Sequence, residues 1–167
     1  GLVFYTRKFV FGEKKIDYQK RFVNFNIKKG EKVLDVGSGG EPFPYATHLV
    51  DKFPQNTHHR YQKLKTNNLP FVEADVQDLP FDDKSFDFVY CSHVLEHVEE
   101  PVKALNEISR VGKRGFIECP KDYWEYVHGD PENQWSAQKE EKCIILNNKP
   151  YINIPFFKSV EIRLGGI

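Results

Sequence analysis

The stretch KVLDVGSGG, at residues 32–40, decides the fold of this chain, because it joins a short apolar run to a run of glycines. The apolar residues of 33–36 predict a strand that is buried on both faces, as the strands of parallel sheets are. The glycines that follow allow a tight turn and a close approach to a ligand, because they carry no Cβ atom. Asp35 lies near the carboxyl end of this strand, where open α/β sheets bind their ligands.

Four further short apolar segments follow along the chain, separated by turns, loops or helices. The predicted strands are 33–36, 47–50, 71–76, 86–91 and 115–119. A helix is predicted between Pro101, which suits a first turn, and Gly112, which suits a helix end. Its apolar face comprises Val102, Leu105, Ile108 and Val111. This alternation predicts an α/β fold around an open, mostly parallel sheet with flanking helices.

Segments on either side of this core predict a helix and a hairpin. An aromatic stripe at helical spacing predicts a helix near 13–25 that packs on the sheet. The stripe comprises Tyr18, Phe22 and Phe25. Residues 142–146 and 150–154 predict a C-terminal β-hairpin that turns at Asn147-Asn148, and 159–164 predicts a last strand.

The composition is that of one globular domain, with 167 residues of which 40% are hydrophobic. Basic and acidic residues number 24 each, so the absence of net charge argues against a nucleic-acid partner. Three cysteines without a C-x-x-C spacing argue against a disulfide framework or a zinc ribbon. Without a signal peptide or a long apolar run, we expect a cytoplasmic protein and no membrane partner.

Three of the predicted strands, in chain order, carry an acid at or just beyond their ends: Asp35, Asp51 and Asp75. If these strands are adjacent and parallel, the three carboxylates line one rim of the sheet. A carboxylate after the second strand can accept hydrogen bonds from both ribose hydroxyls. An acid after the third strand can accept a hydrogen bond from the exocyclic amine of adenine, while the backbone N–H of the next residue donates one to a ring nitrogen. The pattern predicts an adenosine site that requires no phosphate.

These motifs resemble those of the class I S-adenosylmethionine-dependent methyltransferases of the small-molecule type. Residues 33–39 match the first motif of that family, and Asp51 matches its ribose acid. Residues 74–76 match its adenine contact, and 79–98 match its most specific stretch. Residues 110–115 match the family's approach to the fifth strand.

The resemblance implies a Rossmann-like sheet, S-adenosylmethionine as cofactor, and methyl transfer to a small-molecule acceptor. It divides the chain into an N-terminal helical cap at 1–30, a cofactor-binding core at 31–120, and an acceptor-side segment with the hairpin at 121–167. The implied cofactor-binding residues are Asp35, Gly37, Ser38, Gly39, Asp51, Asp75, Val76, Ser92 and His93. The candidates for a catalytic base are His93, His97 and Glu118, each near the carboxyl end of a strand.

The chain departs from the family pattern directly after the glycines. Glu41 stands where the third glycine of the motif belongs, and Pro42 and Pro44 forbid the regular helix that usually follows. A non-catalytic domain of the same fold, which binds S-adenosylmethionine or a partner, therefore stays an alternative.

Two other classes of site fit the sequence less well. A nicotinamide dinucleotide site needs G-x-G-x-x-G at a helix start, and Pro42 stands in place of the last glycine. Residues 93–97 fit the H-x-x-E-H pattern of inverted zinc peptidases, but no second motif supplies a third ligand, so we expect no metal site.

Overall fold

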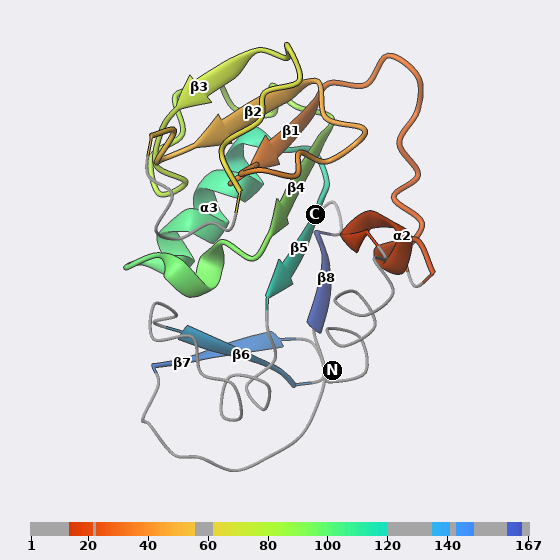
Figure 1. Cartoon of the computed structure of the whole chain (residues 1–167). Coiled ribbons are helices and arrows are strands. Elements are labelled where there is room, and N and C mark those ends of the chain that lie inside the picture. The colour runs from red at the N-terminus through yellow and green to blue at the C-terminus, as the bar shows by residue number, and fades with distance from the viewer. Residues whose placement is uncertain are drawn as a thin grey trace.

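The computed structural model describes residues 14–21, 23–55 and 62–119, together with three strands of the C-terminal part. Five parallel strands form the centre of the molecule (Figure 1). They are β1 (Val33–Val36), β2 (His48–Asp51), β3 (Phe71–Glu73), β4 (Phe88–Ser92) and β5 (Gly115–Cys119). The five predicted strands are confirmed: β1 and β5 have the predicted bounds, and the ends of the other three shift by one to three residues.

The strand order is β3-β2-β1-β4-β5-β8, in which β8 (Val160–Leu164) pairs antiparallel with β5. The chain builds the sheet outward from β1 in one direction and then crosses to β4 on its other side. Loops at the carboxyl ends of β1 and β4 therefore diverge, and ligands of open α/β sheets bind at such a switch point. The mostly parallel α/β fold is confirmed.

Successive residues of the central strands point to opposite faces of the sheet, as the period of a strand requires. One face, formed by side chains such as Leu34 and Val89, packs on helix α3 (Pro101–Val111). The other face includes Val33, Tyr90 and Phe116. Figure 1 shows α3 and the short helix α2 (Lys15–Gln19) on different sides of the sheet.

Aromatic rings cover the sheet face opposite α3, where loops and a short helix replace long helices. Phe25 lies at the centre of this cluster, with ring centroids 5.1 Å from Phe43 and 5.2 Å from Phe116. Phe43 stacks on Tyr90 at 4.0 Å between centroids. Because Pro42 and Pro44 flank Phe43, the segment forms turns and no helix, as the sequence predicts.

The predicted helix near 13–25 is shorter than expected, because α2 ends at Gln19. The chain at 23–28 is not helical, and Phe25 reaches the sheet face from there with only 6% of its surface exposed. Burial of Phe25 thus confirms part of the aromatic stripe. Phe22 and the side chain of Tyr18 lie outside the described residues.

The predicted apolar face of α3 is confirmed at three of its four positions, since Ile108 and Val111 are buried and Leu105 packs against the core, but it is wrong at Val102. Val102 is 64% exposed, whereas Pro101, Ala104 and Ile108 are buried. Because Pro101 starts the helix with its ring facing inward, the buried positions follow it at a spacing of three and four residues, and Val102 is turned toward solvent.

A C-terminal hairpin is present, but its predicted position is wrong. It consists of β6 (Trp135–Glu140) and β7 (Cys143–Asn148). Asn147 and Asn148 do not turn, because they pair with Ser136 and Trp135 within the ladder. The predicted partner at 150–154 lies outside the described residues.

Candidate functional site

A glycine turn connects β1 to the loop that follows it, at the switch point of the sheet. Gly37 and Gly39 have φ values of 67° and 53°, which favour glycine. A Cβ atom on Gly37 would also collide with the side chain of Val94. The amide of Gly37 donates to the carbonyl of Val50 at 2.8 Å, so the turn is fastened to β2.

Asp51 ends β2 and holds the glycine turn through its side chain. Its carboxylate accepts the backbone N–H of Gly39 at 3.0 Å and that of Phe53 at 3.0 Å. The acid therefore lies beside the turn, as the sequence predicts for a residue at the rim.

Asp75 lies two residues beyond β3, on the same edge of the sheet. Lys52, the neighbour of Asp51, places its ammonium 2.6 Å from the Asp75 carboxylate. Burial tends to raise the pKa of Asp75, but hydrogen bonds from Lys52 and Gln77 outweigh it and lower the pKa below its usual value. The next residue, Val76, is buried with 6% of its surface exposed.

Asp35 does not lie at the rim with the other two acids, which corrects the expectation of three carboxylates along one edge. It occupies the third position of β1 and is 2% exposed. Its carboxylate accepts the backbone N–H of Phe43 at 2.7 Å. Burial raises the pKa of Asp35 to about 7, although the Phe43 amide and the charge of Lys15 oppose the shift.

The ends of β4 and β5 bring the remaining predicted residues together. His93 follows β4 with a φ of 58°, which is uncommon for a residue with a side chain. Its Nδ1 lies 3.1 Å from Glu96 Oε1, and its Nε2 lies 3.7 Å from Glu118 Oε2. Ser92 donates its hydroxyl to the same Glu118 oxygen at 2.7 Å. His97 ends the one-turn helix η1 (Leu95–His97) and is exposed.

Two residues that the sequence analysis did not single out complete this network. The Gln19 side chain is fully buried and donates to Glu118 Oε2 at 2.5 Å. Tyr90 donates its hydroxyl to Gln19 Oε1 at 3.0 Å. The one signal in the sequence is a polar residue within the aromatic stripe of the N-terminal segment, which does not name a partner.

Two buried polar atoms near the switch point lack a hydrogen-bond partner among the described residues. They are Ser38 Oγ in the glycine turn and Glu96 Oε2 in η1. Buried polar groups are usually paired, so both atoms are open to a bound ligand or to water. Hydrogen-bonding capacity thus converges on the edge formed by the glycine turn, β4 and η1.

Other kinds of site find less support in the described part of the chain. No helix begins at the glycine turn, so no helix N-terminus is available there for a pyrophosphate. No group of three or more metal-ligating side chains is found among these residues. Likewise, none of their helices is long and apolar enough to cross a membrane.

The sequence is similar to those of known methyltransferases. It is 39% identical over 95 residues to a demethylmenaquinone methyltransferase of Paenarthrobacter aurescens, which covers 54% of this chain and 38% of the relative. It is 29% identical over 142 residues to cycloartenol-C-24-methyltransferase 1 of Oryza sativa subsp. japonica, which covers 78% of this chain and 41% of the relative. The chain therefore spans about two fifths of the length of the curated relatives it matches.

A solved structure shares the fold. A SAM-dependent methyltransferase from Thermotoga maritima superposes with a TM-score of 0.52 at 17% identity, covering 70% of this chain and 57% of that one. The model of a family described as a methyltransferase domain matches residues 34–117, about half of the chain and nearly all of the parallel sheet. With the glycine turn and the acid of β2 in place, the chain belongs to this methyltransferase domain family.

Proposed function

We propose that this chain binds S-adenosylmethionine and carries out methyl transfer to a small-molecule acceptor. The observation that carries the proposal is the contact between Asp51 and the glycine turn, which places a carboxylate beside a bend that has no helix dipole behind it. Such a site suits a nucleoside better than a diphosphate. The names of the relatives point to quinone-like and sterol-like acceptors, so we infer a small and largely apolar one.

The residues of the switch point fit an adenosine group. A carboxylate offers about four acceptor positions, so Asp51 can accept ribose hydroxyls in addition to its backbone donors. Asp75 would accept the adenine amine and the Val76 amide would donate to the ring, with Lys52 keeping the Asp75 carboxylate charged. The unpaired Ser38 hydroxyl would gain a partner when the site is filled.

The residues at the ends of β4 and β5 include a candidate base that could accept a proton from the acceptor. S-adenosylmethionine supplies an electrophilic methyl group on a positively charged sulfur. Where the acceptor loses a proton on attack, Nε2 of His93 would take it. Glu96 holds the ring through Nδ1 at 3.1 Å, whereas Nε2 lies 3.7 Å from Glu118 Oε2, beyond hydrogen-bond distance. Glu96 is then a positioning residue, and the exposed His97 has no such partner among the described contacts.

We also propose that the division of the chain into a cap at 1–30, a core at 31–120 and an acceptor-side segment at 121–167 holds for the function. The core contains the glycine turn and both rim acids, whereas Gln19 of the cap and Glu118 of the core share a hydrogen bond.

Titration calorimetry with S-adenosylhomocysteine beside NAD tests the cofactor proposal. We expect S-adenosylhomocysteine to bind with a stoichiometry of one, and NAD to give no comparable heat, because no helix N-terminus receives its pyrophosphate. Binding of NAD in preference to S-adenosylhomocysteine would remove the proposal.

The second candidate is a binding domain of the same fold without catalysis. It is favoured by the position of the segment at 62–65, which contacts the glycine turn. The Lys65 amide donates to the Gly39 carbonyl at 3.0 Å. A Cβ atom on Gly40 would lie 2.5 Å from that of Gln62. Incubation with methyl-labelled S-adenosylmethionine and quinol or sterol acceptors separates the two, because only an enzyme transfers the label.

A further inference from the structure

We propose that a cavity beside α2 binds an anionic group, a carboxylate or a phosphate, through Lys14, Lys15 and Lys65. This site goes beyond the proposed function, because none of the residues assigned above to the adenosine group lines the cavity. The cavity has a volume of about 360 Å³, which lies within the usual range for small-molecule sites.

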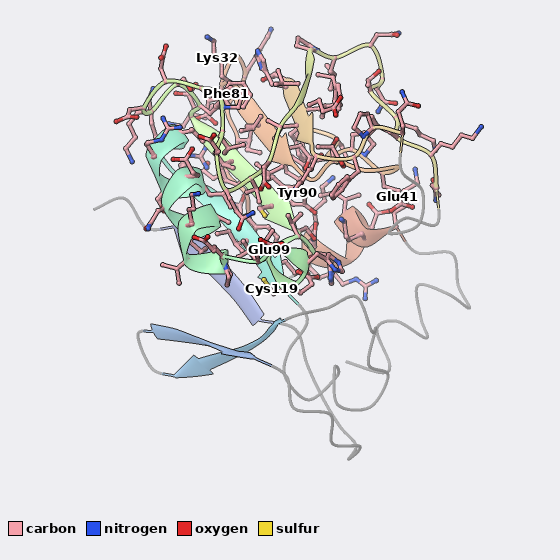
Figure 2. The ribbon with its side chains drawn as sticks, turned by 90° about the vertical axis from the view of Figure 1, so that its left-hand side faces the viewer. Lys32, Glu41, Phe81, Tyr90, Glu99 and Cys119 are labelled. Atoms are coloured by element: carbon pink, nitrogen blue, oxygen red, sulfur yellow. The ribbon has the colours of Figure 1, made fainter. Side chains whose placement is uncertain are left out.

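Three segments far apart in the sequence enclose this cavity, which we call the lysine cavity. The lining comes from residues 14–16, from 40–44, and from a third segment that contains Lys65 and Asn67. Tyr90 of β4 also lines it. In Figure 2, Glu41 lies beside α2 while Tyr90 lies in the interior between the sheet and that helix.

The charges that line the lysine cavity are mostly positive. Lys14 and Lys15 have no carboxylate within ion-pair distance among the residues described here. Lys65 donates to the neutral side chain of Gln62 at 3.3 Å, and Gln62 donates to Glu41, the single acid of the lining, at 3.4 Å. The lining therefore contains three lysines and one acid.

Lys15 is the strongest reason to expect an anion. It is partly buried, and its Nζ lies 5.7 Å from the centre of the Tyr90 ring. A cation over an aromatic ring keeps its N–H donors for other partners, and the charge of Lys15 otherwise acts on the buried Asp35 carboxylate, which lies beyond ion-pair distance. By contrast, Lys52 and Lys113 each lie within 2.7 Å of a carboxylate.

The part of the lining at 42–44 is apolar, and its backbone is restrained. Pro42 and Pro44 restrict the backbone, and Phe43 stacks on Tyr90. A wall that is formed before binding lowers the ordering cost of a ligand. The chemistry therefore points to a small molecule that carries an anionic group next to an apolar portion.

Two sources can supply this anionic group. One is the carboxylate at the amino-acid end of a bound cofactor, because Gly40 belongs both to the glycine turn and to the lysine cavity. The other is an anionic acceptor. Both use the same lysines, and ligands with and without a carboxylate distinguish them.

The experiment compares the wild type with Lys15→Gln, Lys65→Gln and the charge-preserving Lys15→Arg, with Lys103→Gln of the exposed face of α3 as matched control. Binding of inorganic phosphate is followed by NMR shift titration. We expect roughly tenfold weaker binding in Lys15→Gln, because a charge-assisted hydrogen bond is lost, a smaller loss in Lys65→Gln, and near wild-type binding in Lys15→Arg and Lys103→Gln. Phosphate binding that is undetectable in the wild type, or equal in all variants, overturns the proposal.

Calorimetry with S-adenosylhomocysteine and with 5′-methylthioadenosine, which lacks the carboxylate, identifies the source. If the cofactor supplies the anion, Lys15→Gln weakens binding of the first and leaves the second unchanged. If the acceptor supplies it, neither changes while phosphate binding falls. If 5′-methylthioadenosine binds neither the wild type nor any variant, the proposed adenosine site is wrong. The anion site is still judged by the phosphate titration.

Discussion

At the scale of single residues, the burial of Asp35 in β1 makes the stability of the fold depend on pH. Its carboxylate has one backbone donor and almost no contact with solvent, so burial raises its pKa from 3.8 to about 7. Between these values the folded chain holds a proton that the unfolded chain has lost. Stability therefore falls as the pH rises from about 4 to 7, and the Asp35 contribution is constant above that range.

The size of this contribution follows from the shift, since three pKa units correspond to about 4 kcal/mol. Asp35→Asn keeps an oxygen that accepts the Phe43 amide and has no charge to bury. We expect the free energy of unfolding of the wild type to fall, relative to that of Asp35→Asn, between pH 5 and pH 8. Urea denaturation at both values measures this difference, and parallel pH profiles would refute the assignment.

Two constraints favour glycine at position 37, a positive φ and a lack of space for a Cβ atom, and only the first applies at Gly30. Both have positive φ values, 67° and 89°, but a Cβ atom at Gly30 meets nothing within 4 Å whereas one at Gly37 collides with Val94. Gly30→Ala should cost about 1–2 kcal/mol of unfolding free energy from the left-handed conformation. Gly37→Ala should cost clearly more, and equal losses in urea denaturation would show that Val94 moves aside freely.

At the scale of elements, the short helix α2 is attached to the sheet by one buried polar side chain. Gln19 links Tyr90 of β4 to Glu118 of β5. Gln19→Leu leaves both partners buried without this hydrogen bond, so we expect a loss of about 1–3 kcal/mol in the free energy of unfolding. Adding Tyr90→Phe should cost less in the Gln19→Leu background than alone, because the hydroxyl has already lost its Gln19 partner there. Strictly additive losses in thermal melts would exclude the coupling.

The elements that the sequence predicts well are those whose burial is set locally. The apolar runs of β1 and β5 are buried at every position, so their composition alone identifies them. Which residues of α3 are buried depends on the inward position of Pro101 at the helix start. The position of the hairpin in the sequence depends on the pairing of Asn147 with Ser136. Both are decided by tertiary contacts that no local pattern contains.

At the scale of the whole molecule, the site combines residues that the sequence predicts with residues that it does not. Asp51 and Asp75 follow directly from strand order, because parallel strands bring their carboxyl ends to one edge. Asp35 does not, because its side chain turns toward Phe43 inside the fold. Gln19 reaches Glu118 across 99 positions of sequence, and such a contact requires the folded chain.

The residues that we propose bind the cofactor lie at one edge of the parallel sheet. Figure 2 shows Lys32, which precedes β1, and Cys119, which ends β5, at opposite ends of the molecule's core. The glycine turn, both rim acids and the His93 cluster lie after the strands' carboxyl ends. Because Asp51 lies at this edge and contacts the glycine turn, its replacement tests whether the cofactor binds there.

Binding at this edge is tested by measuring the affinity for S-adenosylhomocysteine of the wild type, of Asp51→Ala and of the exposed control Asp82→Ala. A further variant, Asp51→Asn, retains an acceptor for the Gly39 amide. Thermal melts verify that each variant is folded. We expect Asp51→Ala to weaken binding by about 1–3 kcal/mol, Asp51→Asn to weaken it less, and Asp82→Ala to bind as the wild type does. Equal affinity in the wild type and a folded Asp51→Ala variant would contradict this expectation.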